Sequence, residues 1–247
     1  MKHYLITGTS SGLGAALATA LCTPDHHIIG IARRGNPVLA AHAARTGTKY
    51  SEYQFDLTDL AALPALAQII CEKIAPQGGD ELYLVNNAGL IAPLKRAEDA
   101  PPATVLDNIA VNLAAPMLLT SAFLKAFQDF AGIKRIVNIS SGAGRNALPA
   151  WSAYCAAKAG IDRFTQAVAI EQASARHPAT LVAYAPGVLD TAMQEEIRAS
   201  RAEDFPLVGK FIGFKEKGAL KSAEEVAVAV IELLNQPELE NGALLHI

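Results

Sequence analysis

The stretch YLITGTSSGLG, residues 4–14, decides the fold, because it joins a short apolar strand to a helix through a glycine-rich turn. Residues 4–6 predict the strand and residues 15–21 predict the helix. The glycines let the backbone turn sharply and approach a ligand, and the first N–H groups of the helix can bind a phosphate. A glycine-rich turn alone is a weak signal and could be purely structural. Between the first strand and first helix of a βαβ unit, it predicts a dinucleotide-binding site.

Strands alternate with helices along the rest of the chain. Apolar runs predict further strands at residues 28–32, 52–55, 82–85, 135–140, 180–185 and 243–247. This alternation predicts one Rossmann-like α/β domain over residues 1–247, doubly wound around a mostly parallel sheet. One long apolar helix is expected at residues 105–127. The charged, irregular stretch 192–221 predicts a substrate lid, with a disordered surface excursion as the alternative.

Composition and charge narrow the class of protein. Of the 247 residues, 51% are hydrophobic, which favours one well-buried core. A net charge of −3 with mixed signs argues against a nucleic-acid partner. No apolar run reaches the about 18 residues of a membrane span, and the first residues lack the pattern of a signal peptide. A cytoplasmic protein without membrane contact is therefore expected.

Cysteine and histidine spacing predicts no metal site. The 3 cysteines lie far apart, and the 6 histidines lack the spacing of metal ligands. Cys22, Cys71 and Cys155 are expected to be buried small side chains. His26 and His27 are expected to lie in a loop and to be solvated.

Two arginines bear on the choice of nucleotide. Arg33 and Arg34 follow the strand at 28–32, about twenty residues after the glycine turn, where NAD-binding units usually carry an acid for the ribose hydroxyl. Arginine suits a 2′-phosphate instead, and Ala32 supplies no acid. The pair favours NADP. Two merely solvated surface arginines are the alternative.

The most reactive side chains follow the strand at 135–140. Tyr154 and Lys158 lie one helical turn apart on one face, so the ammonium can act on the phenol. A fixed cation lowers the pKa of a phenol toward the range in which it exchanges a proton with a carbonyl or alcohol. Such pairs also arise often by chance on helix surfaces. Ser140 and Ser141 end the preceding strand, however, so a hydroxyl and a phenol can face one carbonyl oxygen.

The other polar motifs also follow predicted strand ends, where open α/β sheets bind their ligands. They are the glycine turn, Arg33, Asp56, the NNAG run at 86–89, Ser141 and the Pro186-Gly187 turn. Asn112 lies inside the long apolar helix and needs partners there. It could cap a kink, or it could hold a water near the site.

These motifs in this order resemble the short-chain dehydrogenase/reductase family over essentially the full chain. The resemblance implies that Tyr154 is the general acid, that Ser141 holds the substrate carbonyl, and that Lys158 binds the ribose and lowers the pKa of the tyrosine. It also implies that Asn112 holds a water of the proton relay. The cofactor contacts expected for NADP are Gly8, Ser10, Ser11, Gly12, Leu13, Gly14, Arg33, Arg34, Asp56, Leu57, Asn87, Ala88, Gly89, Tyr154, Lys158, Pro186, Gly187, Val188 and Thr191.

Within the family, the runs NISSGAG, WSAYCAAKAG and YAPGVLDTAMQ are similar to sepiapterin reductases and to the bacterial benzil reductases that form (S)-benzoin. The run IRASRAEDF (residues 197–205) is more similar to the benzil reductases. This resemblance implies NADPH-dependent reduction of a small vicinal dicarbonyl, with a homodimer or homotetramer expected. A nucleotide-sensing protein on the same scaffold is the remaining alternative.

Substrate choice between these two groups depends on one carboxylate. Pterin-using sepiapterin reductases carry it near the C-terminus, and the corresponding run GALLHI (residues 242–247) has none, which favours an aromatic diketone. Asp190, Glu195 or Glu196 could supply the acid from the lid instead. The side chains expected at the substrate are Ser141, Trp151, Tyr154, Tyr184 and Met193.

Overall fold

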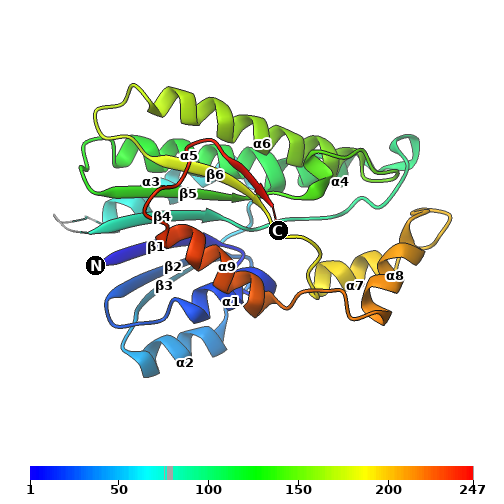
Figure 1. Ribbon diagram of the computed structural model, residues 1–247, viewed down its shortest axis with the longest axis horizontal. Coiled ribbons are helices and arrows are strands. Elements are labelled where there is room, and N and C mark those ends of the chain that lie inside the picture. Colours follow the sequence, from blue (N-terminus) through cyan, green and yellow to red (C-terminus); the bar gives the residue numbers. More distant parts are fainter. Residues whose placement is uncertain (75, 77–79, 247) are drawn as a thin grey trace.

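The computed structural model describes residues 1–74, 76 and 80–246. A 7-stranded sheet runs through it in the order β3-β2-β1-β4-β5-β6-β7, and every neighbouring pair is parallel (Figure 1). The doubly wound parallel sheet predicted from the sequence is confirmed. Its strands are β1 (Lys2–Thr7), β2 (His26–Ala32), β3 (Lys49–Gln54), β4 (Glu81–Asn86), β5 (Ile133–Ile139), β6 (Thr180–Ala185) and β7 (Leu244–His246). The last strand was predicted to include Ile247, which lies outside the described residues.

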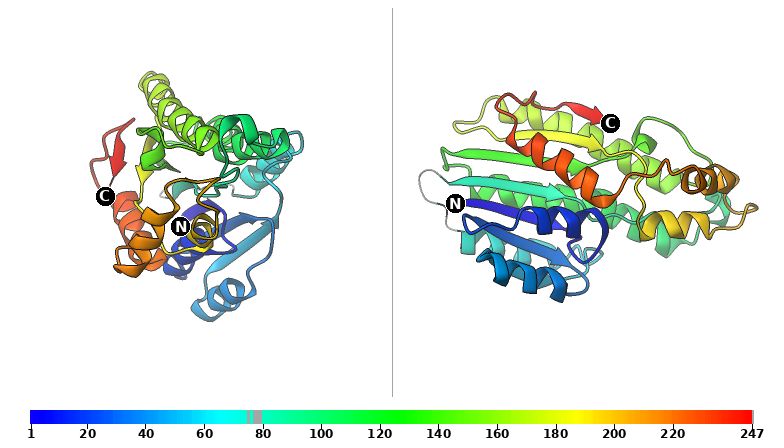
Figure 2. Two further views of the ribbon diagram at one scale, coloured as in Figure 1. Left: turned by 90° about the vertical axis from the view of Figure 1, so that its right-hand side faces the viewer. Right: turned by 60° about the horizontal axis from the view of Figure 1, so that its bottom comes forward.

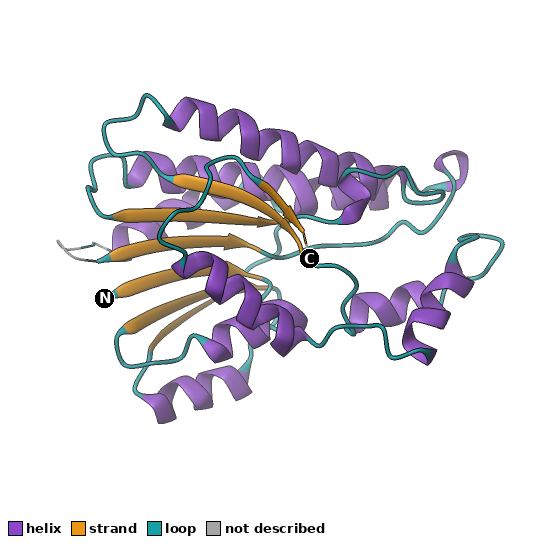
Figure 3. Ribbon diagram, in the orientation of Figure 1, coloured by secondary structure: helices purple, strands orange, loops and turns teal. Residues whose placement is uncertain are grey.

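Helices cover both faces of the sheet (Figure 3). One face carries α1 (Gly12–Ala20), α2 (Pro37–Thr46) and α9 (Ala223–Asn235). The other carries α3 (Leu63–Ile74), α4 (Pro102–Ile109), α5 (Ala115–Ala126) and α6 (Ser152–Gln172). Alternation along the strands separates two cores: Tyr4 and Ile6 of β1 pack toward α1 and α9, whereas Leu5 packs toward α3 and α5.

The lid is helical rather than irregular. It contains α7 (Ala192–Arg198) and α8 (Val208–Glu216), which pack against each other beyond the carboxyl ends of the strands (Figures 1 and 2). Phe205 between them is fully buried. The lid therefore has a small apolar core of its own, which the charged sequence pattern concealed.

The long helix predicted at 105–127 is interrupted. It runs as α4, a π-helical turn at Ala110–Ala114, and α5. The three segments follow one another without a gap over Pro102–Ala126. By length and composition alone, this run could cross a membrane, with a mean hydropathy of 1.5 in its most apolar window. Its α5 segment contacts α3 and α6 and buries Leu119 and Phe123 in the core. Many core helices of soluble proteins have this same composition, so the length of the helix is weak evidence for a membrane.

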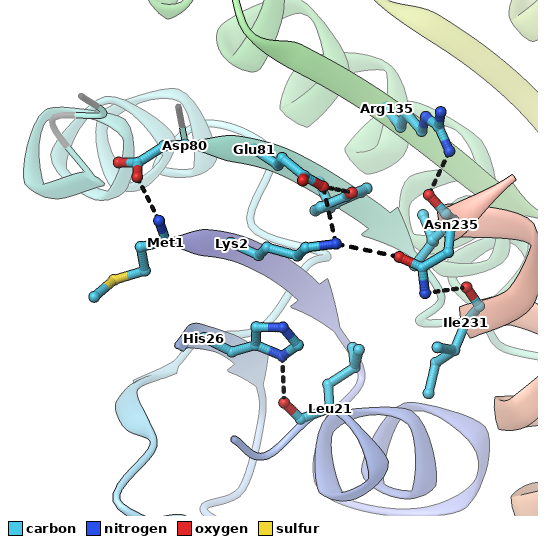
Figure 4. Close-up of polar contacts among 11 residues, drawn as sticks. Met1, Lys2, Leu21, His26, Asp80, Glu81, Arg135, Ile231 and Asn235 are labelled. Carbon is cyan, nitrogen blue, oxygen red and sulfur yellow. Dashed lines mark hydrogen bonds and ion pairs between the residues drawn. The ribbon is translucent and has the colours of Figure 1, made fainter. Parts of the chain in front are cut away.

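The amino ends of the strands are tied together by polar contacts (Figure 4). Lys2 donates to Asn235 Oδ1 at 3.3 Å and pairs with Glu81 at 3.1 Å, and Arg135 donates to the Leu234 carbonyl at the end of α9. Cations at a helix C-terminus satisfy its last carbonyls and oppose its dipole. These contacts fix the C-terminal end of α9 at the amino edge of the sheet.

The prediction that His26 and His27 are solvated in a loop is wrong. Both lie in β2, and His27 is 3% exposed. Its Nδ1 lies 3.3 Å from His3 Nδ1, and its Nε2 lies 3.0 Å from Ser51 Oγ. Burial lowers the pKa of His27 to about 4. The strand starts earlier than its apolar run because neighbouring strands supply hydrogen-bond partners for polar side chains. Cys22 and Cys71 are buried, as predicted, whereas Cys155 is half-buried.

Candidate active site

A cavity of about 980 Å³ lies at the carboxyl ends of the strands and beneath the lid. It is lined by most of the residues that the sequence singled out, from the glycine turn through the arginines and the NNAG run to Ser141, Tyr154 and Lys158. Trp151 and Met193 also line it. Of the predicted site residues, Gly14, Asn112 and Tyr184 are not in its lining.

The glycine turn forms one end of the cavity. Gly8 and Gly12 have φ values of 78° and 56°, which favour glycine. The Ser11 side chain makes no capping hydrogen bond at the start of α1, so it leaves the N–H groups of the first turn to a ligand. A Cβ on Gly14 would lie 2.3 Å from the Gly8 carbonyl oxygen, so Gly14 allows the helix to pack on the turn and does not itself face the cavity. This backbone fits the phosphates of a dinucleotide.

Thr7 joins the glycine turn to the NNAG run, and the sequence analysis missed it. Its hydroxyl accepts from the N–H groups of Asn87 and Ala88, both at 2.9 Å. The Asn87 amide donates to the Thr7 carbonyl at 2.9 Å. The ends of β1 and β4 are therefore held in register. A threonine immediately before the first glycine was the available signal.

The arginine loop is fixed beside the glycine turn. Arg33 and Arg34 are exposed and line the cavity. Asn36, next along, accepts from Leu39 N at 3.0 Å as the cap of α2 and donates to the Thr9 carbonyl at 2.9 Å. Its own N–H donates to Glu52 at 2.8 Å. The two cations are thus carried on a loop that Asn36 anchors on its C-terminal side.

Asp56, at the end of β3, also lines the cavity. Its Oδ1 accepts from the N–H and the hydroxyl of Thr58, at 3.0 and 2.9 Å. These hydrogen bonds, and the charge of Arg33, lower the pKa of Asp56. The carboxylate is therefore fixed as an acceptor beside the arginine loop.

Tyr154 and Lys158 project from α6 toward the end of β5. Lys158 Nζ donates to the Ile139 carbonyl at 2.8 Å and lies 5.6 Å from the centre of the Tyr154 ring. Burial raises the pKa of Tyr154 to about 12, against the opposite effect of the Ser141 hydroxyl. Burial also lowers the pKa of Lys158 to about 8, against the effect of Asp162. Burial thus sets the direction of both pKa shifts, and the group that lowers the pKa of Tyr154 is the Ser141 hydroxyl.

Asn112 lies in the π-helical turn and is buried. Its Nδ2 donates to the Leu90 carbonyl at 2.7 Å, and its Oδ1 accepts from Leu90 N at 3.1 Å. Asn108, one turn earlier, donates to the carbonyls of Leu90 and Ala92. Both amides thus fix the segment after the NNAG run, and Asn108 escaped the sequence analysis. Single π-turns are often found at functional sites.

Aromatic side chains from the lid and α6 wall the far end of the cavity. Trp151 stacks on Phe205 with ring centres 5.2 Å apart, and its ring lies 5.3 Å from that of Phe211. Phe211 and Phe214 of α8 line the cavity, and the sequence analysis missed both. Their three-residue spacing, which places both on one helix face, was the available signal.

Tyr184 is not a wall of this cavity, contrary to the prediction. Its side chain packs in the core cluster that contains Leu17 of α1 and Val226 of α9. Alternation along β6 determines this, since Tyr184 and Val182 lie on one face and Leu181 on the other. A position at a strand end does not by itself fix the direction of the side chain.

Comparisons with known proteins show the family of this chain. The family model for short chain dehydrogenase matches residues 2–202. A benzil reductase ((S)-benzoin forming) from Bacillus cereus is 41% identical over 100% of this chain and 99% of its own length. A sepiapterin reductase from Bos taurus is 30% identical over 97% of this chain and 91% of its own length. The crystal structure of the KRED1-Pglu enzyme superposes with a TM-score of 0.83 at 26% identity, covering 100% of both chains. The chain belongs to the short-chain dehydrogenase family of nicotinamide-dependent oxidoreductases, and its relatives support carbonyl reduction as its reaction.

Proposed function

We propose that this protein uses NADPH to reduce a vicinal dicarbonyl of the benzil type at one carbonyl, giving the S hydroxyketone. The observation that carries the proposal is the difference between the residues that line the two ends of the cavity. Tyr154 lies between a phosphate-binding glycine turn at one end and the apolar, aromatic wall of the lid at the other. A flat diketone has the matching character, with a polar centre and apolar rings.

Each side chain of the site has a separate role in the proposed reaction. The glycine turn and the start of α1 would hold the pyrophosphate, and Lys158 would hold the nicotinamide ribose. When bound there, the nicotinamide supplies a hydride to the carbonyl carbon. Tyr154 donates a proton to the carbonyl oxygen, and the Ser141 hydroxyl donates a hydrogen bond to the same oxygen. Hydride and proton together convert one carbonyl to an alcohol.

The pKa values suit reduction. A Tyr154 pKa of about 12 keeps the phenol protonated at neutral pH, which is the form that donates. Hydride addition places negative charge on the carbonyl oxygen, which then becomes a stronger base. The proton is therefore present on the phenol before the reaction starts.

Preference for NADPH is supported by the loop after β2. Arg33 and Arg34 line the cavity on a loop anchored by Asn36. Ala32 places no carboxylate where a ribose 2′-hydroxyl would need an acceptor. Guanidinium groups bind phosphate through charge-assisted hydrogen bonds, so a 2′-phosphate is the expected ligand.

A pterin is the second candidate substrate, and Glu196 is the observation that favours it. Of the three candidate acids Asp190, Glu195 and Glu196, only Glu196 lines the cavity, and burial raises its pKa. Asp190 pairs instead with Lys215 at 2.5 Å and faces Arg198 at 3.9 Å. A pterin amino group left without an acceptor costs about 1–3 kcal/mol, and Glu196 is the group placed to offset that cost.

The experiment is a comparison of kcat/KM for benzil and sepiapterin with NADPH. We expect benzil to be preferred by about tenfold or more, because its rings need no polar partner. Glu196→Gln should leave benzil reduction unchanged and weaken any sepiapterin reduction. Glu195→Gln, on the neighbouring residue outside the cavity lining, is the matched control. A preference for sepiapterin that Glu196→Gln abolishes would replace the diketone with the pterin.

A further inference from the structure

Asp162 is a buried carboxyl group next to the catalytic pair, and no step described so far uses it. It lies on α6 four residues after Lys158 and eight after Tyr154, so the three side chains share one helix face. Asp162 is 6% exposed, Lys158 is 4% exposed and Tyr154 is 7% exposed. Burial raises the pKa of Asp162, so a carboxylate at this position needs compensating groups.

The turn after β5 packs directly on this carboxylate. A Cβ added to Gly144 would lie 2.7 Å from Asp162 Oδ2 and 2.9 Å from the Lys158 carbonyl oxygen. Asp162 Oδ1 and Ser140 Oγ are both buried without a hydrogen-bond partner among the described residues. The Ser140 hydroxyl lowers the pKa of Asp162, so Ser140, directly after β5, is one of the groups that favour the ionised carboxylate.

Charges around Asp162 stabilise its ionised form. Arg145, which follows the turn, and Lys158, on the same helix, both lower the pKa of Asp162. Lys158 in turn faces Tyr154 and Asp162 on α6 and the Ile139 carbonyl on β5. Among the residues that the structure describes, Asp162 is the one whose charge raises the pKa of the Lys158 ammonium against burial. A buried ammonium without a carboxylate nearby tends to lose its proton.

We propose that Asp162 is a positioning residue that keeps Lys158 in its ammonium form at neutral pH. The proposal rests on the role of Lys158 in the function proposed above. In that function, the ammonium binds the ribose and returns a proton toward Tyr154 after each turnover. A neutral amine would perform both roles less well. Asp162 touches no reacting atom. It acts on the reaction only through the charge of Lys158.

The test measures the titration of Lys158 directly. Acetic anhydride reacts with neutral amines, and Lys158 lines the cavity. Labelling across a pH series, read at the Lys158 peptide by mass spectrometry, gives the midpoint of its titration. Asp162→Asn, which removes the charge and keeps the shape, should lower that midpoint by about one pH unit. The readout needs neither nucleotide nor ketone, so it is informative even if benzil is not a substrate.

Two further variants complete the design. Glu171→Gln removes an exposed carboxylate from the same helix and should leave the midpoint unchanged. Asp162→Ser, shorter and also uncharged, should reproduce the shift if Asp162→Asn misfolds. The basic limb of kcat/KM should move to lower pH in the same variants, because the ammonium is lost earlier. An unchanged or raised midpoint would overturn the proposal, as would loss of folding in both uncharged variants, which would make Asp162 a packing residue.

Discussion

The two ends of the cavity are built in different ways. The nucleotide end is held by hydrogen bonds to backbone groups: Gly8 N donates to the Ile31 carbonyl at 2.7 Å, and the Thr7 hydroxyl accepts from Asn87 N at 2.9 Å, which ties β1 to the end of β4. The lid end is held by rings, with Trp151 and Phe211 in contact, and by an ion pair of 2.6 Å between Lys95 and Asp204. Hydrogen bonds to backbone groups hold the turn in place for any sequence that can form it. Ring contacts depend on the particular side chains.

The difference assigns separate tasks to the two ends. A rigid backbone cradle suits the phosphates and ribose that every nicotinamide nucleotide shares. An apolar wall contributed by side chains can change shape through substitution, which suits the choice of substrate. Substitutions at the nucleotide end should therefore leave the choice of substrate unchanged, and substitutions at the lid end should leave the choice of nucleotide unchanged. Substitutions at Tyr154 should abolish the reaction without changing either choice.

The largest expected effect is at the residue between the two ends. Tyr154→Phe removes the proton donor and little volume, so kcat should fall by about 100-fold or more. NADPH binding, followed by nucleotide fluorescence, should stay within about twofold of the wild type. Cys155→Ser is the control at the neighbouring, half-buried position. Near-normal turnover in Tyr154→Phe would move the acid to another residue.

At the nucleotide end, Arg33→Ala should shift the ratio of kcat/KM for NADPH over NADH by about ten- to a hundredfold toward NADH. A charge-assisted hydrogen bond contributes about 1.5–3 kcal/mol, which sets this range. The ratio of benzil to sepiapterin turnover should not change. Arg45→Ala, on the exposed end of α2, is the control. A wild-type protein that already prefers NADH would show that the arginine loop does not select the nucleotide.

Acid should destabilise the amino edge of the sheet, opposite both ends of the cavity. The pKa of His27 is about 4 when folded and about 6.5 when unfolded, so the unfolded chain takes up a proton first as the pH falls. Stability should therefore decrease between pH 6.5 and pH 4, by about 2 kcal/mol between pH 7 and pH 5. Urea unfolding at each pH measures it, and His27→Gln should flatten the slope. An equal slope in that variant would assign the effect to other groups.

At the lid end, Phe211→Leu keeps an apolar side chain and removes the ring contact with Trp151. Aromatic pairs contribute about 0.5–1.5 kcal/mol, so kcat/KM for benzil should fall by about two- to tenfold. The preference for NADPH over NADH should be unaffected. Ile212→Ala, at an exposed position on the same helix, is the control. A matching loss of NADPH preference would show that the two ends are coupled.

Most residues predicted to contact the nucleotide line the cavity, because the sequence patterns that locate them are local. Glycines at a strand-to-helix turn, and polar residues at strand ends, follow from backbone geometry that any parallel sheet imposes. What it missed there, such as Thr7 and Asn36, are side chains whose partners are far away in the chain. Such contacts become visible only once strand order places β1 beside β4 and β2.

The lid and the interior of α6 were harder to predict, because their contacts also depend on how the chain folds and not on local pattern. The ring contact between Phe205 and Phe211 joins a residue before α8 to one inside it, so no single helical period links the two positions. Tyr184 was misplaced because alternation along β6, not proximity to the strand end, sets its direction. In the sequence, nothing distinguishes Asp162 from an exposed carboxylate on a helix. Only the structure shows that it is buried against Gly144.

One measurement tests the central claim most directly: the product formed when the purified protein consumes NADPH in the presence of benzil. Chiral chromatography quantifies benzoin, and absorbance quantifies the nucleotide. The account predicts one benzoin formed for each NADPH oxidised, with the S enantiomer in excess. NADPH that binds to the protein but is not oxidised by benzil, sepiapterin or any other vicinal dicarbonyl would contradict it, and would favour a nucleotide-sensing protein on this scaffold.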